Sequence, residues 1–109
     1  MKKEYCLRIH CAPQNILKIT KIIELEPNDI YGWAYTFNEI NFNSILDKVE
    51  KKMTQLNKVE SLNDKIELWI YYEYEDQCNL EFDPTLLKKL GKMGCTLCIS
   101  CWDKIWKPN

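Results

Sequence analysis

The segment KIELWIYYEY, residues 65–74, constrains the fold of this chain more than any other. Apolar side chains occupy every second position, at Ile66, Leu68, Ile70 and Tyr72. Acidic and aromatic side chains occupy the positions between them, at Glu67, Trp69, Tyr71 and Glu73. A repeat of two residues is typical of a β-strand, in which successive side chains point to opposite faces of a sheet. We therefore predict a strand with one face on a core and the other at a partly open surface.

Other segments are predicted as strands from related patterns. In YCLRIHC (5–11), one face is polar and consists of Cys6, Arg8 and His10. In YGWAYTF (31–37), aromatic side chains alternate with small or polar ones, at Tyr31, Trp33, Tyr35 and Phe37. CTLCISCW (95–102) is apolar on both faces, which favours a central position in a sheet. LEF (80–82) follows a turn at 75–79, and we expect it to pair back as a short strand.

Three helices are predicted between these strands. Pro13 suits the first turn of the first helix, and Pro27 disfavours helical geometry at the preceding residue and ends it. The second helix lies within residues 41–62, and its apolar face consists of Phe42, Ile45, Leu46, Val49, Met53 and Leu56. The third has Asp83 as its N-cap and stops at Gly94, a left-handed C-cap.

The order of elements alternates between strand and helix, which could suggest a doubly wound parallel sheet. Strands 5–11 and 65–74 each keep one polar face, however, whereas sheets of that class are covered on both faces. We therefore predict an α+β two-layer sandwich, with a four- to five-stranded sheet and three helices mainly on one face. A chain of 109 residues suits one domain, 1–109, with a single core.

Several of these segments together resemble a bacterial family of small domains of unknown function. The resemblance is carried by ITKIIELEP (19–27), Trp33, the long helix, and FDPTLLKKLGKMGCTLCIS (82–100). Family members have a helix ending near a proline, a following tryptophan, and a late helix–glycine–strand unit in this order. The resemblance spans most of the chain, and it implies the same architecture and no catalytic residues. In size and character the chain also resembles small immunity proteins that neutralise bacterial toxins.

Composition argues against several classes of partner. The formal net charge is −1, and the chain has fourteen lysines but one arginine, Arg8, which is a poor inventory for binding nucleic acid. No apolar run approaches the roughly 20 residues of a membrane helix, and the N-terminal residues lack the apolar run of a secretory signal. We therefore expect a cytoplasmic protein with reduced thiols and no nucleic-acid or membrane partner.

The segment CTLCISC has the C-x2-C-x2-C spacing known from iron–sulfur proteins. On a strand, however, Cys95 and Cys101 point to one face and Cys98 to the other, so the three cannot converge on one metal. In the first strand, His10 and Cys11 likewise face opposite ways, which argues against a nucleophilic pair. We therefore expect no metal, no cofactor, no structural disulfide and no enzymatic activity.

Charge is divided unevenly along the chain. From Glu60 to Asp83 there are eight acidic residues against Lys65, and from Pro84 onward there are five lysines against Asp103. The acidic stretch can be a solvated edge whose charges prevent strand aggregation. It can also be an interface, because tyrosine and tryptophan dominate binding hot spots and acidic surfaces attract basic partners.

The leading functional hypothesis is a non-enzymatic binding protein that acts as an immunity- or antitoxin-like inhibitor. Its partner would be a basic protein such as a nuclease toxin, contacted by Glu67, Trp69, Tyr71, Glu73, Glu75 and Asp76. The alternative is a small-ligand-binding or accessory domain that holds an apolar molecule on the open sheet face, with Trp33 and Trp69. A third hypothesis is a metal or redox protein that uses the cysteine triplet. The sequence does not distinguish a monomer from a dimer.

Overall fold

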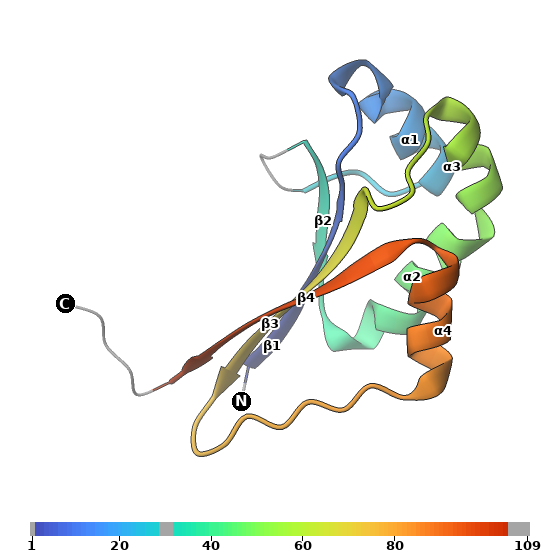
Figure 1. The fold of residues 1–109 in the computed structure, drawn as a ribbon. Coiled ribbons are helices and arrows are strands. Elements are labelled where there is room, and N and C mark those ends of the chain that lie inside the picture. The colour runs from blue at the N-terminus through green and yellow to red at the C-terminus, as the bar shows by residue number, and fades with distance from the viewer. Residues whose placement is uncertain (1, 29–31, 105–109) are drawn as a thin grey trace.

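The computed structural model describes residues 2–28 and 32–104 of the chain. Tyr31 of the predicted second strand and most of the predicted tail (103–109) lie outside the described residues. The elements run, in chain order, β1 (Lys2–Ile9), α1 (Ile16–Ile23), β2 (Trp33–Phe37), α2 (Phe42–Lys51), α3 (Met53–Val59), β3 (Ile66–Tyr74), α4 (Pro84–Lys92) and β4 (Cys95–Asp103) (Figure 1). Short 3-10 turns at Pro13–Asn15 and Glu39–Asn41 lead into α1 and α2.

The strands form one mixed sheet in the order β2-β1-β3-β4. β1 is antiparallel to both of its neighbours, and β3 is parallel to β4 through a crossover that contains α4. The predicted α+β class is confirmed. Within the described residues the sheet has four strands, and the fifth strand predicted at 80–82 does not form.

The prediction that the last strand is central was wrong, because β4 lies at the edge of the sheet. Its apolar residues are covered only in part: Ile99 is 42% exposed and Trp102 is 38% exposed. The physical reason is that β1 already pairs with the other side of β3, which leaves β4 only one neighbour. The local pattern of apolar residues in a strand does not predict how many other strands pair with it.

The described residues contain four α-helices where three were predicted, because the long second helix is interrupted at Lys52. The Lys52 N–H bonds to the Val49 carbonyl at 3.0 Å, three residues back, which tightens the turn before α3 begins. The first helix ends before Pro27: Glu24 adopts a left-handed conformation (φ 64°) and closes the helix by donating to the Thr20 carbonyl. None of these helices is long and apolar enough to cross a membrane.

The boundaries of α4 agree with the prediction. The Asp83 carboxylate accepts the Leu86 N–H at 2.8 Å, which satisfies a donor of the first turn. Gly94, with φ 62°, follows the helix in the left-handed conformation. A side chain there would also meet Asn63, since a Cβ atom would lie 2.6 Å from its Oδ1 atom.

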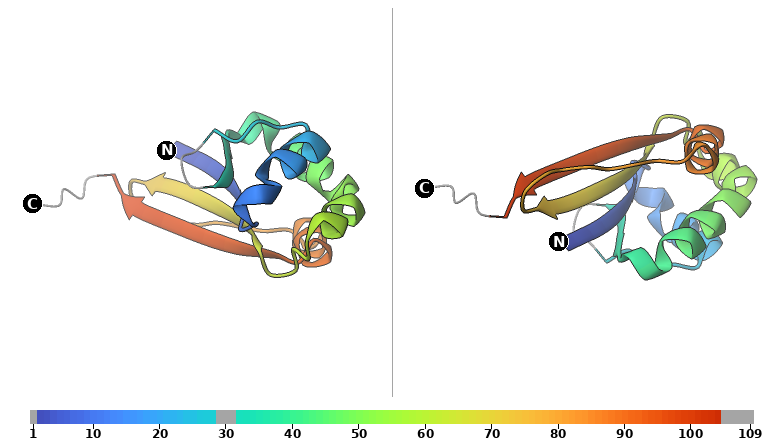
Figure 2. Two further views of the ribbon diagram at one scale, coloured as in Figure 1. Left: turned by 90° about the horizontal axis from the view of Figure 1, so that it is seen from above. Right: turned by 90° about the horizontal axis from the view of Figure 1, so that it is seen from below.

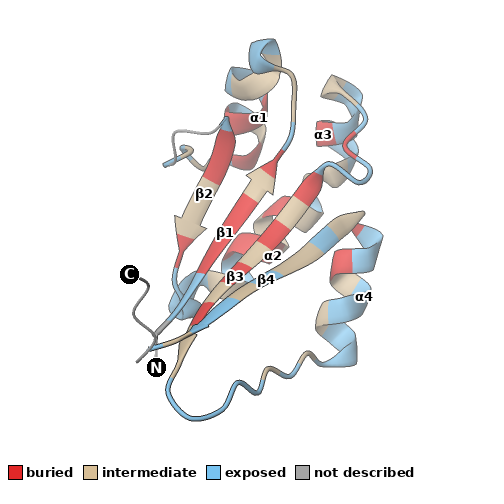
Figure 3. Ribbon diagram, turned by 60° about the vertical axis from the view of Figure 1, so that its left-hand side comes forward, coloured by how far each residue is buried: buried red, intermediate tan, exposed pale blue. Residues whose placement is uncertain are grey.

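The core lies between the helices and one face of the sheet. Figure 2 shows the helices grouped on one side of the twisted strands. The alternation predicted for 65–74 is confirmed, because Ile66, Leu68 and Ile70 are fully buried and Glu67, Trp69 and Tyr71 are half-buried (Figure 3). Each helix contributes apolar side chains to the same core: Ile19 and Ile23 from α1, Ile45 and Leu46 from α2, Leu56 from α3, and Leu90 from α4. The opposite side of the sheet carries the candidate functional site.

Candidate functional site

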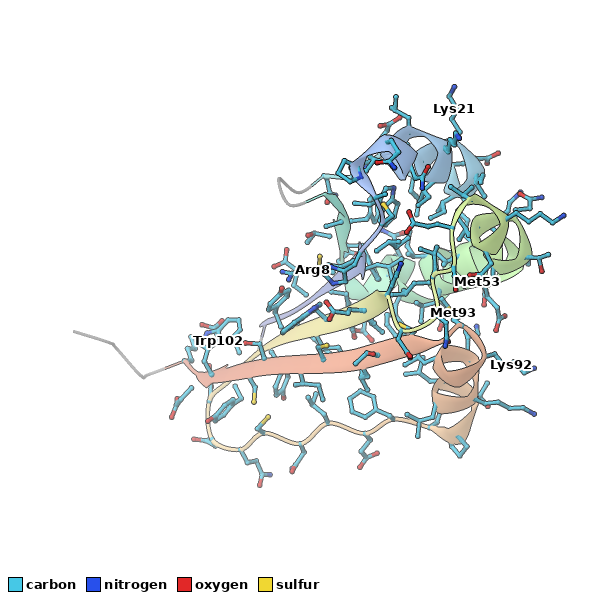
Figure 4. All side chains as sticks on the ribbon, turned by 45° about the horizontal axis from the view of Figure 1, so that its top comes forward. Arg8, Lys21, Met53, Lys92, Met93 and Trp102 are labelled. Carbon is cyan, nitrogen blue, oxygen red and sulfur yellow. The ribbon has the colours of Figure 1, made fainter. Side chains whose placement is uncertain are left out.

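We call the sheet surface opposite the core the open face. Its residues come from alternate positions of three strands that the register brings side by side. Arg8 of β1 pairs with Glu67 of β3, and Trp69 pairs with Cys6 on one side and Cys98 on the other. From β1, β3 and β4 the open face includes Glu4, Cys6, Arg8, Glu67, Trp69, Tyr71, Glu73, Thr96, Cys98, Ser100 and Trp102. Arg8 and Trp102 both lie away from the helices in Figure 4.

Two stacked aromatic rings occupy the middle of this face. The rings of Trp69 and Tyr71 are 6.1 Å apart between centroids and only 13° from parallel. The Arg8 guanidinium lies over the indole, with its carbon 5.0 Å from the Trp69 centroid, and its Nη2 atom donates to the Tyr71 hydroxyl at 2.8 Å. The cation–π contact and the charge-assisted hydrogen bond both favour this arrangement of the Arg8, Trp69 and Tyr71 side chains. The Arg8–Trp69–Tyr71 cluster is thus ordered by its own contacts.

Glu67 lies beside this cluster. One of its carboxylate oxygens accepts the Trp69 indole N–H at 3.0 Å and contacts His10 Nε2 at 2.8 Å. The hydrogen bond from His10, and then that from Trp69, lowers the pKa of Glu67 below its usual value. Glu67 is therefore a carboxylate at neutral pH, and its charge is directed toward groups of the same protein.

Further carboxylates gather where β3 ends, in a group that we call the acidic end: Glu4, Glu73, Glu75 and Asp76. Glu4 lies beside Tyr71 in the register, and Glu73 lies beside Trp102. Glu75 pairs with Lys104 at 3.1 Å, which lowers the pKa of that carboxyl, and both side chains remain half-exposed. Asp76 is exposed in the following turn. Acid and aromatic surface are therefore contiguous on the open face.

The structure brings three of the predicted contact residues, Glu67, Trp69 and Tyr71, into one network of contacts. Glu73 lies farther along the same face, and Glu75 and Asp76 follow the strand. Sequence reasoning missed two members of the site, Arg8 of β1 and His10, which directly follows β1. The polar alternation of residues 5–11 placed them on one face of their strand, but the register that joins them to β3 is not visible in the sequence.

The cysteine triplet has the alternating arrangement that was predicted. Cys98 pairs with Trp69 on the open face, whereas Cys95 and Cys101 pair with the core-facing residues Ile66 and Tyr72. Burial raises the pKa of Cys95 to about 12, and burial also raises the pKa of Cys98, so both stay protonated thiols at neutral pH. Within residues 2–28 and 32–104, no group of three or more histidine, cysteine or acidic side chains is arranged to hold a metal ion.

Two hollows lie on the helix side of the molecule. A cleft of about 190 Å³ is lined by apolar and charged side chains: Lys3, Tyr5, Glu39, Phe42, Ile70, Glu81, Phe82, Asp83 and Leu86. A shallower hollow follows α2 and is lined by Ser44, Asp47, Lys48, Lys51 and Lys52. The prediction that Trp33 joins Trp69 on the open face was wrong. Trp33 is buried in the core, where its indole N–H donates to the Thr20 hydroxyl at 3.2 Å.

No family model, curated protein sequence or solved structure matches this chain.

Proposed function

We propose that the chain is a non-enzymatic binding protein whose open face receives a basic protein partner. The observation that carries this proposal is the Arg8–Trp69–Tyr71 cluster, an ordered pair of half-buried aromatic rings beside the carboxylates of the acidic end. The few residues that contribute most of the binding free energy in protein interfaces are enriched in tryptophan, tyrosine and arginine. The contacts to the partner are Glu67, Trp69, Tyr71, Glu73, Glu75 and Asp76.

The order within the cluster supports a role in binding. Association costs free energy when side chains must be immobilised, at about 0.5–1.5 kcal/mol for each flexible side chain. Stacking and the Arg8 contacts already restrict the rings of Trp69 and Tyr71 in the unbound chain. Less free energy is then lost on binding than from the same residues on a mobile loop.

The charges support a basic partner. Arg8 is the one arginine of the chain, and it lies close enough to Glu67 to affect the titration of that carboxyl. Its positive charge is thereby offset, while Glu4 and Asp76 remain exposed at the acidic end. Such a surface attracts a positively charged protein over long range and accelerates the encounter. A nuclease toxin fits this description, because its substrate-binding surface is positive, and an immunity-like inhibitor would cover that surface.

The test begins with the tagged chain as bait in a lysate of its own host, followed by kinetics on the captured protein. Tyr71→Ala should raise the dissociation rate, since loss of a hot-spot side chain costs about 2 kcal/mol or more, which is about 30-fold in affinity. Glu75→Lys should slow association and weaken its dependence on salt. If the partner is a nuclease, the wild-type chain should inhibit its cleavage of nucleic acid.

Leu87→Ala is the matched control, because Leu87 is an exposed apolar residue of α4 on the helix side. It should bind the partner as the wild type does. Open-face variants that fold normally and bind with unchanged rates would contradict the proposal.

A second candidate function is supported by the cleft on the helix side. Its apolar walls include Tyr5, Phe42 and Phe82, and Glu39 and Glu81 lie at its polar side. Lys3 lines the same cleft and pairs with Glu39, so Glu81 is the carboxylate that would receive an organic amine beside the apolar wall. Thermal stabilisation of the chain by an alkyl or aryl amine, lost in Glu81→Gln, would support this candidate, and the absence of any shift would contradict it.

A further inference from the structure

Residues 75–83 connect β3 to α4 without forming a helix or a strand, and we call this segment the strap. Figures 1 and 4 both show the strap running back beside β4 toward the start of α4. Its first half, residues 75–79, is exposed (Figure 3). The strap thus follows the edge strand of the sheet without joining it by strand pairing.

Contacts at both ends hold the strap in place. At its start, the Lys104 N–H bonds to the Tyr74 carbonyl at 2.7 Å, and the Lys104 amine pairs with Glu75. At its other end, Phe82 packs against the core and Asp83 caps α4. The middle of the strap makes no such backbone or core contact with other residues that the structure describes.

Two cysteines meet across the gap between the strap and β4. Cys78 lies four residues after Tyr74, and Cys101 lies three residues before Lys104, so the link between Tyr74 and Lys104 brings both cysteines to the same level. The Cys101 thiol lies close enough to Cys78 to raise the pKa of that thiol. Both residues are exposed, and both are free thiols.

We propose that Cys78 and Cys101 form a redox-sensitive disulfide that fastens the strap to β4. The oxidant is a low-molecular-weight disulfide such as oxidised glutathione. One cysteine thiolate attacks the glutathione disulfide, which forms a mixed disulfide and releases one glutathione thiolate. The second cysteine thiolate attacks the protein sulfur of that mixed disulfide and releases the second glutathione. Two electrons pass from the protein to glutathione, and the two protons of the cysteines end on the two glutathione thiols.

The reaction depends on pH in a defined direction. Partial desolvation, and next the adjacent Cys101 thiol, raise the pKa of Cys78. Because the thiolate is the reactive form, cross-linking is slow at neutral pH and becomes faster as pH rises.

The bond would affect more than the strap itself. It closes a loop that runs from residue 78 to residue 101 and contains the whole of α4. Glu81, Phe82 and Asp83 of this loop line the cleft on the helix side. Oxidation would therefore restrict one wall of that cleft, while the open face, on the other side of the sheet, keeps its arrangement.

The experiment exposes the reduced, purified full-length chain to oxidised glutathione at about pH 8. Remaining thiols are then alkylated and tryptic peptides are mapped without reduction. We expect the alkylated thiols to fall from six to four. The chain should lose the mass of two hydrogens, and peptide 66–88 should be joined to peptide 93–104.

Single substitutions assign the bond. Cys78→Ser and Cys101→Ser should abolish the cross-link, whereas Cys98→Ser, which removes a thiol from the opposite face of β4, should retain it. All three substitutions change partly or fully exposed positions, so the chain should still fold. A disulfide-linked dimer on a non-reducing gel, a stable glutathione adduct on Cys78, or six unreacted thiols would each overturn the proposal.

Discussion

The two faces of β3 use the same backbone for different purposes. On one face, Leu68 and its neighbours in the pattern are buried among apolar side chains from every helix. On the other, Trp69 and Tyr71 are held by directional contacts, with Arg8 above the indole and Glu67 on its N–H. Burial of apolar area stabilises the first face, and hydrogen bonds and a cation–π contact organise the second.

Two tryptophans make this comparison concrete. Trp33 of β2 is 1% exposed, and its indole N–H is satisfied by a buried threonine. Trp69 is half-buried, and its indole N–H is satisfied by a charged glutamate at the surface. An aromatic residue in a strand is therefore no guide to function by itself. The partner of its polar atom distinguishes a core ring from a ring that is available for contact.

The largest expected effect comes from breaking the helix-covered face. Leu68→Ala should lower the free energy of unfolding by about 2–5 kcal/mol, because Leu68 is completely buried and the substitution leaves a cavity. Chemical denaturation followed by circular dichroism measures the change. Thr96 is an exposed residue of the open face, and Thr96→Ser should change the free energy of unfolding by no more than about 0.5 kcal/mol. Equal losses in the free energy of unfolding for Leu68→Ala and Thr96→Ser would contradict the claim that burial of apolar side chains stabilises only the helix-covered face.

A smaller effect is expected from Arg8→Met, which keeps an unbranched apolar stem and removes the charged guanidinium group. The loss of the cation–π contact and of the bond to Tyr71 should lower the free energy of unfolding by about 1–2 kcal/mol. The near-ultraviolet circular dichroism should change as well, because Trp69 and Tyr71 lose the group that orders them. Lys3→Met removes an exposed ion pair with Glu39 on the other face, and it should lower the free energy of unfolding by less than Arg8→Met does. A larger loss for Lys3→Met would count against an ordered open face.

The smallest effect concerns pH. Contacts from His10 and Trp69 lower the folded-state pKa of Glu67 below its unfolded value of about 4.3. This stabilisation is present above the unfolded pKa and is lost as pH falls through the lower, folded pKa. Glu67→Gln should therefore lose less stability than the wild type during acid titration, as followed by urea denaturation at successive pH values. Parallel titration curves for the two proteins would mean that Glu67 is not held by these contacts.

Local patterns in the sequence predicted much of the fold. The period of two in 65–74 placed residues 66–73 of β3 on their correct faces, and Asp83 and Gly94 marked the ends of α4. The break at Lys52 was missed, since neither glycine nor proline interrupts that helix. The edge position of β4 was missed because strand order depends on contacts between distant residues.

The candidate site could be predicted only in part, for a similar reason. Trp69 and Tyr71 were visible as aromatic residues on a polar face. Their ordering by Arg8 depends on the antiparallel register between β1 and β3, in which residues 59 positions apart, such as Arg8 and Glu67, become neighbours. Neither strand contains a signal for that register beyond its own alternation.

The central claim is that a partner contacts the open face of the sheet and leaves the helix-covered face unchanged. The most direct test records the indole N–H signals of the ¹⁵N-labelled chain by NMR while the captured basic partner is added. Trp69→Phe assigns one signal by its absence, and Trp33→Phe assigns another. We expect the Trp69 signal to shift as the complex forms and the Trp33 signal to stay in place. A complex that saturates with the Trp69 signal unmoved would contradict the account.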